Sequence, residues 1–220
     1  MQRLDLKIHG LTVVAPFKET SIPFATSIDC DLVQLSKSSN LFVQKDKAWF
    51  SQTTDSVGVL NGLKKRKISP KGLKTAILGC GGAGRTIAAA LKQEQAVVTL
   101  VNRSVDRGAS AANLLQLPFV PLAKFVPEDF DLIINAINLG KTTTTLPFDV
   151  QKMRKKAILV DMSYNIPSTF LTKKARNLGI EVIDGFEILN EQVQNQFFKL
   201  TNRTMPNELH LAPQIPFLTP

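Results

Sequence analysis

The feature that most constrains this sequence is a run of glycines that separates a short apolar segment from an amphipathic one. Residues 75–78 are apolar or β-branched, and residues 85–92 place their apolar side chains on one helical face. Between them, Gly79, Gly81 and Gly84 have the spacing G-x-G-x-x-G. In a strand–turn–helix unit these glycines permit a tight turn, a close approach of the backbone to a pyrophosphate, and close packing of helix on strand. We therefore predict a dinucleotide site here, because the free N–H groups at a helix start also attract phosphate.

The same alternation of apolar runs and amphipathic segments continues along the chain. Strands are expected at 75–78, 96–101, 131–135, 157–161 and 180–183, and helices at 85–92, 105–115, 169–178 and 186–200. Because these strands are continuously apolar, they indicate a parallel sheet that is covered on both faces, with right-handed crossovers. The sequence therefore predicts an α/β fold with a doubly wound, Rossmann-type parallel sheet, in a cofactor domain over residues 61–190.

Residues 1–60 have a thinner pattern. Residues 3–15, in which apolar and polar residues alternate before an apolar run at 11–15, are expected either as an extended piece or as the end of a helix joined to a strand. Residues 41–43 and 48–50 flank a polar turn and predict a hairpin. We expect a second, small domain over 1–60. The tail after Met205 contains four prolines and predicts an irregular end.

The end of the second expected strand indicates which dinucleotide is bound. A site for NAD usually has an acidic residue there, which holds the ribose hydroxyls. This chain instead has Asn102, Arg103 and Ser104, followed by Arg107, and Asp106 lies beyond the strand end. Two guanidinium groups can clamp a 2′-phosphate, with Asn102 and Ser104 donating hydrogen bonds. We favour NADP over NAD, and the alternative is a pair of solvated arginines.

Composition narrows the possible partners. The net charge is +9, but the excess is spread along the chain, and the dense run at residues 64–67 has no interleaved aromatic side chains. We interpret that run as a solvated loop or helix end, and we expect no nucleic-acid partner and no metal.

Cys30 and Cys80 cannot build a disulfide framework, and Cys80 is interpreted as a small residue that fills the glycine loop. No apolar stretch approaches the length of a membrane span, so a reduced, cytoplasmic protein is expected.

Eight segments carry a resemblance to a known family. They are Val14–Glu19 (V-T-x-P-x-K), Ser38–Asn40 (A-V-N), Thr53–Gly58 (N-T-D-G-x-G), Gly79–Gly84 (G-A-G-G-A), Asn102–Ser104 (N-R-T/S), Asn135–Gly140 (N-A-T-x-x-G), Asp161–Thr169 (D-M-x-Y-x-P-x-x-T) and Asp184–Gln192 (D-G-x-x-M-L-x-x-Q). In this order they resemble the motifs of the shikimate and quinate dehydrogenase family. The resemblance covers nearly the whole chain.

The resemblance implies the NADP-dependent, reversible reduction of 3-dehydroshikimate to shikimate, a step in chorismate and aromatic amino-acid biosynthesis. It assigns Lys18 and Asp55 as the catalytic pair. Hydride transfer to a carbonyl carbon requires that the oxygen gain a proton, and an ammonium group at that oxygen stabilises the developing charge and can deliver one. A carboxylate beside the ammonium orients it and keeps it charged.

The same resemblance implies further site residues. Asn40, Tyr164 and Gln192 would contact the hydroxyl or carboxylate groups of the substrate. The cofactor would be bound by Gly79, Gly81, Gly82, Ala83, Gly84, Asn102, Arg103, Ser104 and Arg107, with Asn138 and Gly185 near its nicotinamide half. Residues 191–220 would return to the substrate domain as a helix and an irregular tail. A monomer or a homodimer is expected.

Departures from the family pattern fall mainly in the substrate half. The segment S-x-S-P-x-x-H-N, whose serines bind the substrate carboxylate, has no counterpart, so we expect an incomplete α/β substrate domain with an unpaired sheet edge and exposed apolar surface. Val14, Thr53, Ile137 and Ile188 replace Thr, Asn, Thr and Met of the family motifs. Three alternatives stay open at this point: part of a bifunctional enzyme that also carries 3-dehydroquinate dehydratase, a non-catalytic remnant that binds NADP or a partner, and a quinate enzyme that uses NAD, against which the N-R-S motif argues.

Because the cofactor motifs are nearly complete and the substrate motifs are not, we predict that this chain binds NADP more tightly than it binds shikimate. Titration of each ligand into the same protein by calorimetry measures the two affinities. Tight binding of shikimate without any binding of NADP would contradict the prediction.

Overall fold

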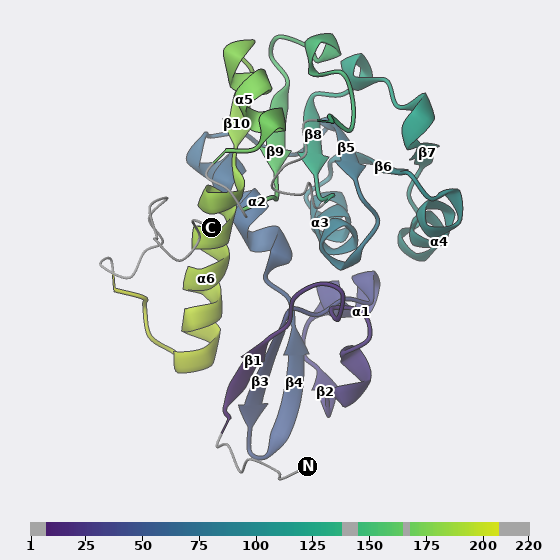
Figure 1. The fold of residues 1–220 in the computed structure, drawn as a ribbon. Helices are drawn as coiled ribbons and strands as arrows, with labels where there is room; N and C mark the ends of the chain where they lie inside the picture. Colours follow the sequence, from purple (N-terminus) through teal and green to yellow (C-terminus); the bar gives the residue numbers. More distant parts are fainter. Residues whose placement is uncertain (1–7, 138–144, 165–167, 207–220) are drawn as a thin grey trace.

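The fold consists of two sheets that lie one above the other (Figure 1). A computed structural model describes residues 8–137, 145–164 and 168–206. The strands are β1 (Gly10–Thr12), β2 (Ser27–Ile28), β3 (Leu41–Lys45), β4 (Ala48–Gln52), β5 (Lys74–Leu78), β6 (Val97–Asn102), β7 (Phe119–Pro121), β8 (Leu132–Asn135), β9 (Ile158–Asp161) and β10 (Glu181–Ile183). The α-helices are α1 (Asp31–Ser36), α2 (Asp55–Lys65), α3 (Gly82–Gln93), α4 (Val105–Leu115), α5 (Phe170–Asn177) and α6 (Gly185–Thr201). Short 3-10 helices lie at Ile22–Phe24, Leu122–Lys124, Pro127–Asp129 and Val150–Lys152.

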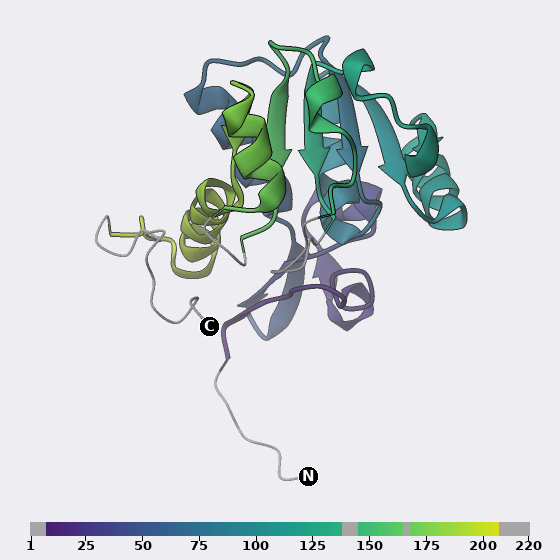
Figure 2. The same ribbon diagram turned by 45° about the horizontal axis from the view of Figure 1, so that its top comes forward.

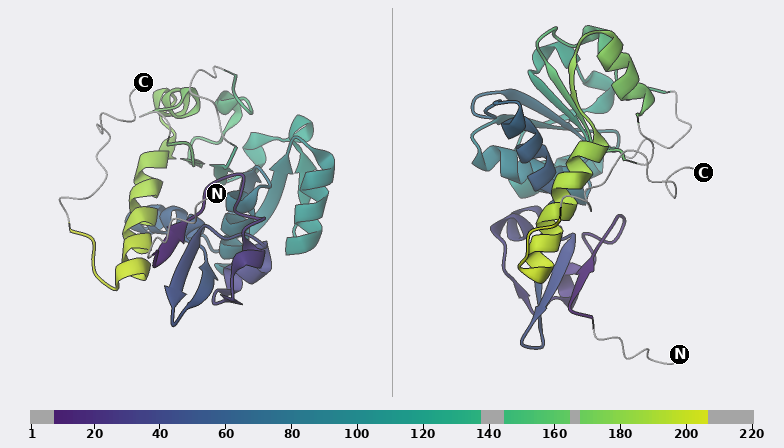
Figure 3. Two further views of the ribbon diagram at one scale, coloured as in Figure 1. Left: turned by 60° about the horizontal axis from the view of Figure 1, so that its bottom comes forward. Right: turned by 90° about the vertical axis from the view of Figure 1, so that its left-hand side faces the viewer.

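The larger sheet has six parallel strands in the order β10-β9-β8-β5-β6-β7. Successive residues of a strand contribute to opposite faces. Ile77 and Ile134 join a core formed with α2, α3, α4 and the start of α6, and Leu78 and Ile133 join a second core formed with α5 and the segment before β9. Figure 3 (right) shows the helix layers on the two sides of this sheet. The two apolar cores explain the continuously apolar strands, and the predicted α/β, doubly wound fold is confirmed.

The smaller sheet has four strands in the order β1-β3-β4-β2. The predicted hairpin is confirmed: β3 pairs antiparallel with β4, and its turn residues Asp46 and Lys47 have φ of 49° and 65°, as a two-residue hairpin turn requires. β1 pairs with β3 on one side only and forms an edge of this sheet among the described residues. Ile8, Leu11 and Val14 are exposed at this edge, in agreement with the expected unpaired edge.

The small sheet faces the carboxyl ends of the parallel strands. Figure 2 shows the arrowheads of these strands pointing toward the smaller sheet. Two helices connect the sheets. α2 follows β4 and leads to β5, and α6 follows β10 and runs back beside β3 (Figure 3, right). The side chain of Asp184 starts α6 by accepting hydrogen bonds from the backbone N–H groups of Phe186 and Glu187, both at 3.1 Å.

The helix α2 was not predicted from the sequence. It contains Gly58 and Gly62, and glycine disfavours an isolated helix by about 1 kcal/mol per residue. Both glycines are needed because α2 lies against α6 and β10: a Cβ built on Gly58 would lie 2.5 Å from the carbonyl oxygen of Ile188, and one on Gly62 would lie 2.9 Å from Cγ2 of Ile183. The tertiary contact therefore overrides the low helix propensity.

The basic run at residues 64–67 lies at the end of α2, as one of the two interpretations had it, but it is not simply solvated. Arg66 pairs with Glu187 of α6 at 2.6 Å and with Glu181 of β10 at 2.5 Å. Lys65 pairs with Glu191 of α6 at 2.5 Å. The hydrogen bond to Glu187 is the largest contribution to the raised pKa of Arg66. Lys65 and Arg66 therefore link α2 to α6, and Arg66 also links it to β10 of the larger sheet.

No helix in the described part of the chain has the length and apolar character that a membrane span needs.

The close approach of α2 to α6 can be tested with Gly58→Ala. Alanine stabilises an unhindered helix position, but here its methyl group meets the backbone of Ile188. We expect the free energy of unfolding to fall by about 1–3 kcal/mol, the usual range for overpacking, as measured by urea denaturation. Asn113→Ala on the exposed side of α4 is the control and is expected to have little effect. Equal or greater stability of Gly58→Ala would contradict the described packing.

Candidate active site

An ion pair between Lys18 and Asp55 lies at the junction of the two sheets. Lys18 is in the loop after β1, and Asp55 is the first residue of α2. Nζ of Lys18 is 2.7 Å from Oδ1 and 2.9 Å from Oδ2 of Asp55. The Asp55 side chain is 2% exposed and the Lys18 side chain 17% exposed. Because both carboxylate oxygens accept from one ammonium group, the position of Nζ is closely fixed.

A network of amides holds the Asp55 carboxylate. Nδ2 of Asn40 donates to Oδ1 of Asp55 and to Oγ1 of Thr54, both at 3.0 Å. The backbone N–H of Thr54 donates to Oδ1 of Asn40 at 2.8 Å. Nε2 of Gln192, on α6, donates to the backbone carbonyl of Asp55 at 3.2 Å. The network brings three predicted site residues, Asn40, Asp55 and Gln192, into direct contact.

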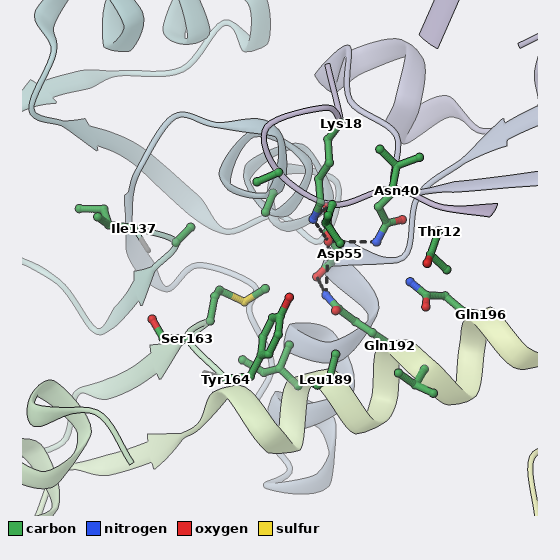
Figure 4. A pocket seen from close by; sticks show the side chains of 18 residues that line it. Thr12, Lys18, Asn40, Asp55, Ile137, Ser163, Tyr164, Leu189, Gln192 and Gln196 are labelled. Carbon is green, nitrogen blue, oxygen red and sulfur yellow. Dashed lines mark hydrogen bonds and ion pairs between the residues drawn. The ribbon is translucent and has the colours of Figure 1, made fainter. Parts of the chain in front are cut away.

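A pocket of about 360 Å³ opens beside this network. Its walls come from the loop after β1, from α6, and from the segments that follow β8 and β9. Figure 4 shows the Tyr164 ring directed with its hydroxyl group toward Lys18, Asp55 and Gln192. Lys18 is the only cationic side chain that lines the pocket in the described part of the chain, so an acidic ligand would depend largely on uncharged hydrogen-bond donors.

Asn135 and Asp161 join the ends of β8 and β9, next in sequence to residues that line the pocket. Nδ2 of Asn135, at the end of β8, donates to Oδ1 of Asp161, at the end of β9, at 2.9 Å. The other oxygen of Asp161 accepts from the hydroxyl of Thr169 at 2.6 Å. All three side chains are buried. Their polar groups satisfy one another, so these residues serve the structure of the site and are not free to bind a ligand.

The glycine loop has the conformation that its spacing predicts. Gly79 has φ of 103°, in the region that favours glycine. Gly84 has no room for a Cβ, because the carbonyl of Gly79 lies against it. Gly81 has open space, and the nearest atom to a Cβ built there would be Nη2 of Arg107 at 3.7 Å. Gly82 packs against Lys18 and Ser38 from the small-sheet side. The loop therefore touches the segment that carries the ion pair.

The remaining predicted cofactor residues lie in the glycine loop, at the end of β6 and at the start of α4. Ala83 lines the pocket. The side-chain oxygen of Asn102 accepts from the backbone N–H of Cys80 at 3.2 Å, which joins β6 to the glycine loop. Ser104 caps α4 by accepting from the backbone N–H of Arg107 at 3.4 Å, and the side chain of Arg103 is exposed.

Of the two residues predicted near the nicotinamide half, the structure describes one. Gly185 packs closely against the backbone of Ser163 and Tyr164 at the start of α6. Asn138 lies outside the described residues.

Four polar residues around the site were not predicted. Glu19 pairs with Arg85 at 3.1 Å and with Arg107 at 2.8 Å. Thr12 and Gln196 line the end of the pocket opposite Ile137 and Ser163 (Figure 4), and Nε2 of Gln196 donates to the hydroxyl of Thr54 at 3.0 Å.

The fourth, Ser163, has a buried hydroxyl group without a hydrogen-bond partner among the described residues. Gln196 had a sequence signal, because it lies four residues after Gln192 and so shares its helix face.

Within the described ranges, no group of three or more His, Cys, Asp or Glu side chains is arranged to hold a metal ion.

Comparison with known proteins gives one consistent result. The chain is 32% identical over 204 residues to a curated protein named shikimate dehydrogenase (NADP(+)) from Pelagibacter ubique (strain HTCC1062), covering 87% of this chain and 72% of that protein. A relative with the same name from Ignicoccus hospitalis is 30% identical over 190 residues, with 86% and 71% covered. No family model matches the sequence.

Solved structures agree with these relatives. The crystal structure of shikimate dehydrogenase from Aquifex aeolicus superimposes with a TM-score of 0.83 at 28% identity, covering 91% of this chain and 74% of that one. The enzyme from Thermus thermophilus in complex with NADP(H) and shikimate has a TM-score of 0.81 at 27% identity, with 91% and 76% covered.

The burial of Cys80 predicts low thiol reactivity. Desolvation raises the pKa of the Cys80 thiol to about 11, although Arg107 and Arg85 act in the opposite direction. At pH 8 about one such thiol in a thousand is ionised, and only the thiolate reacts. Cys30 is partly exposed, so we expect iodoacetamide to label Cys30 first, and Cys80 to react only as the pH rises toward 11. Mass spectrometry of Cys30→Ser and Cys80→Ser variants checks this, and rapid labelling of Cys80 at pH 8 would contradict it.

Proposed function

The chain belongs to the shikimate dehydrogenase family, and we propose on that basis that it catalyses the NADP-dependent, reversible reduction of 3-dehydroshikimate to shikimate. The observation that carries the proposal is the Lys18–Asp55 ion pair, 2.7 Å long, in a pocket beside the glycine loop. Relatives of at least 30% identity bear the name of this enzyme. A solved structure of similar fold contains both NADP(H) and shikimate.

The residues around the glycine loop fit NADP. The space over Gly81 leaves the backbone open to a pyrophosphate, and α3 presents its free N–H groups there. β6 ends without an acidic residue, and Nη2 of Arg107 lies close to Gly81. We propose that Arg103 and Arg107 hold the 2′-phosphate and that Asn102 and Ser104 shape the turn between them. Gly79, Gly82, Ala83 and Gly84 complete this loop, and Asn138 and Gly185 are proposed near the nicotinamide half.

In the proposed mechanism Lys18 serves the oxygen of the reacting carbonyl group. When bound, NADPH supplies the hydride that goes to the carbonyl carbon. The ammonium of Lys18 donates a hydrogen bond to the carbonyl oxygen, stabilises the negative charge that develops there and supplies the proton. Asp55 keeps this ammonium charged and in position. In the reverse direction Lys18 accepts the proton of the substrate hydroxyl group.

The amide network gives the pair its fixed geometry. Asn40 holds Asp55 from the small sheet, and Gln192 holds the backbone of Asp55 from α6. We propose that Asn40 and Gln192 also reach the hydroxyl groups of the substrate. Tyr164, whose hydroxyl is directed into the pocket (Figure 4), is proposed to contact its hydroxyl or carboxylate groups.

We further propose that residues 1–60 and 61–190 act as substrate and cofactor domains and that α6 returns to the substrate domain; from residue 207 on, the predicted irregular tail lies outside the described residues. A monomer or homodimer in the cytoplasm completes the proposal. The alternatives of a bifunctional dehydratase fusion and of a non-catalytic remnant are not favoured, because the relatives described above are named as shikimate dehydrogenases alone.

Lys18→Met and Asp55→Asn test the proposed chemistry. Both variants keep the size of the side chain. Lys18→Met removes the ammonium group at the carbonyl oxygen, and Asp55→Asn removes the carboxylate that keeps this ammonium charged and in position. We expect kcat for NADPH oxidation with 3-dehydroshikimate to fall by about 10²- to 10⁴-fold, the usual contribution of a general acid, while the affinity for NADP is unchanged. Lys64→Met removes an exposed lysine of α2 and is the matched control. Full activity of Lys18→Met would contradict the assigned role.

A further inference from the structure

Glu19 carries a carboxylate group that lies between two arginines of the cofactor half. Oε1 of Glu19 is 2.8 Å from Nη2 of Arg107, and Oε2 is 3.1 Å from Nη2 of Arg85. Arg85 is in the first turn of α3 and Arg107 in the first turn of α4. Glu19 itself belongs to the loop after β1 and directly follows Lys18. The two ion pairs therefore cross from the small-sheet side to the glycine loop.

The two arginines form a site that requires an anion. Arg85 is 13% exposed, and its Nε is buried without a hydrogen-bond partner among the described residues. Desolvation by burial lowers the pKa of Arg85, and the nearby charge of Arg107 lowers it further. Glu19 is the acidic side chain that offsets these effects. Its two carboxylate oxygens each serve one guanidinium group.

Arg107 also faces the space over the glycine loop. Its Nη2 atom, the same atom that contacts Glu19, would lie 3.7 Å from a Cβ on Gly81. The Arg107 side chain is 57% exposed, so it can turn between two partners, whereas Arg85 is nearly enclosed and additionally donates to the carbonyl oxygen of Lys37 at 3.0 Å. The contact of Glu19 with Arg107 is therefore the one that a second anion can replace.

We propose that Glu19 is a specificity-determining residue for the cofactor, which competes inside the protein with the 2′-phosphate of NADP for Arg107. The inference rests on the proposed function, because it requires that Arg107 bind this phosphate. A phosphate monoester carries more charge than a carboxylate and forms strong bidentate contacts with arginine, so NADP displaces Glu19 from Arg107 while Glu19 keeps Arg85. NAD has no such group, so the Glu19–Arg107 pair persists when NAD binds. Glu19 thus weakens the affinity for NADP selectively.

Glu19→Gln tests the competition, with calorimetric titration of NADP, of NAD and of adenosine 2′,5′-bisphosphate into the full chain. We expect the variant to bind NADP and the bisphosphate about two- to fivefold more tightly, the size expected for a partly exposed ion pair, and to bind NAD as before. In the Arg107→Gln background the Glu19→Gln change should have no effect on any of the three ligands. Glu94→Gln, an exposed change of the same charge at the end of α3, is the matched control for net charge.

The outcomes separate this inference from the proposed function. Unchanged or weaker binding of NADP by Glu19→Gln, with normal turnover of 3-dehydroshikimate by the unmodified chain, would overturn the competition and leave the proposed function intact. An equal gain for NAD and NADP would also overturn it, because the effect would then not involve the 2′-phosphate. An unmodified chain that binds neither dinucleotide would overturn both.

Discussion

The close packing of α2 against α6 is the constraint on which both the fold and the site depend. The backbone of Gly58 approaches that of Ile188 so closely that no larger side chain fits. α2 begins with Asp55, and α6 carries Gln192, whose amide reaches the carbonyl oxygen of Asp55. The contact that joins the two sheets therefore also positions the residues of the site. A substitution at this helix contact would act on the pocket without touching it.

Charged groups at this junction are satisfied by partners from distant parts of the chain. Burial of a carboxylate costs free energy unless the group is paired and hydrogen-bonded. Asp55 pairs with Lys18, accepts a hydrogen bond from Asn40 and lies in the first turn of α2. Arg66 joins α2 to acids of α6 and β10 in the same way. These contacts do not add much free energy where they are exposed, but they give each side chain one position. The pocket is thus organised before any ligand arrives.

The sequence predicted what local patterns encode. Strands β5, β6, β8 and β9 were found because both faces of the sheet are apolar, and the glycine loop was found because its spacing follows from backbone geometry. α2 was missed because glycine disfavours a helix, although the packing of α2 on α6 requires its glycines. β7 was missed because it is short and ends in Pro121. Lys18 and Asp55 came only from the order of family motifs. Glu19 and Gln196 were missed because their partners, Arg107 and Thr54, are 88 and 142 residues away in sequence.

The helix α6 also connects the larger sheet to the edge of the smaller sheet, so a small change of its angle at one end moves the other end. It has 17 residues and is therefore about 25 Å long. Its first residue, Gly185, is wedged against the backbone of Ser163, and Leu200 near its other end meets Gly10 on the edge strand β1. A tilt of about 5° at Gly185 displaces the far end by about 2 Å and Gln192 by about 1 Å, a shift large enough to disturb a reacting geometry. The contacts at the two ends of α6 therefore act together with its packing against α2 in setting how accurately the pocket is built.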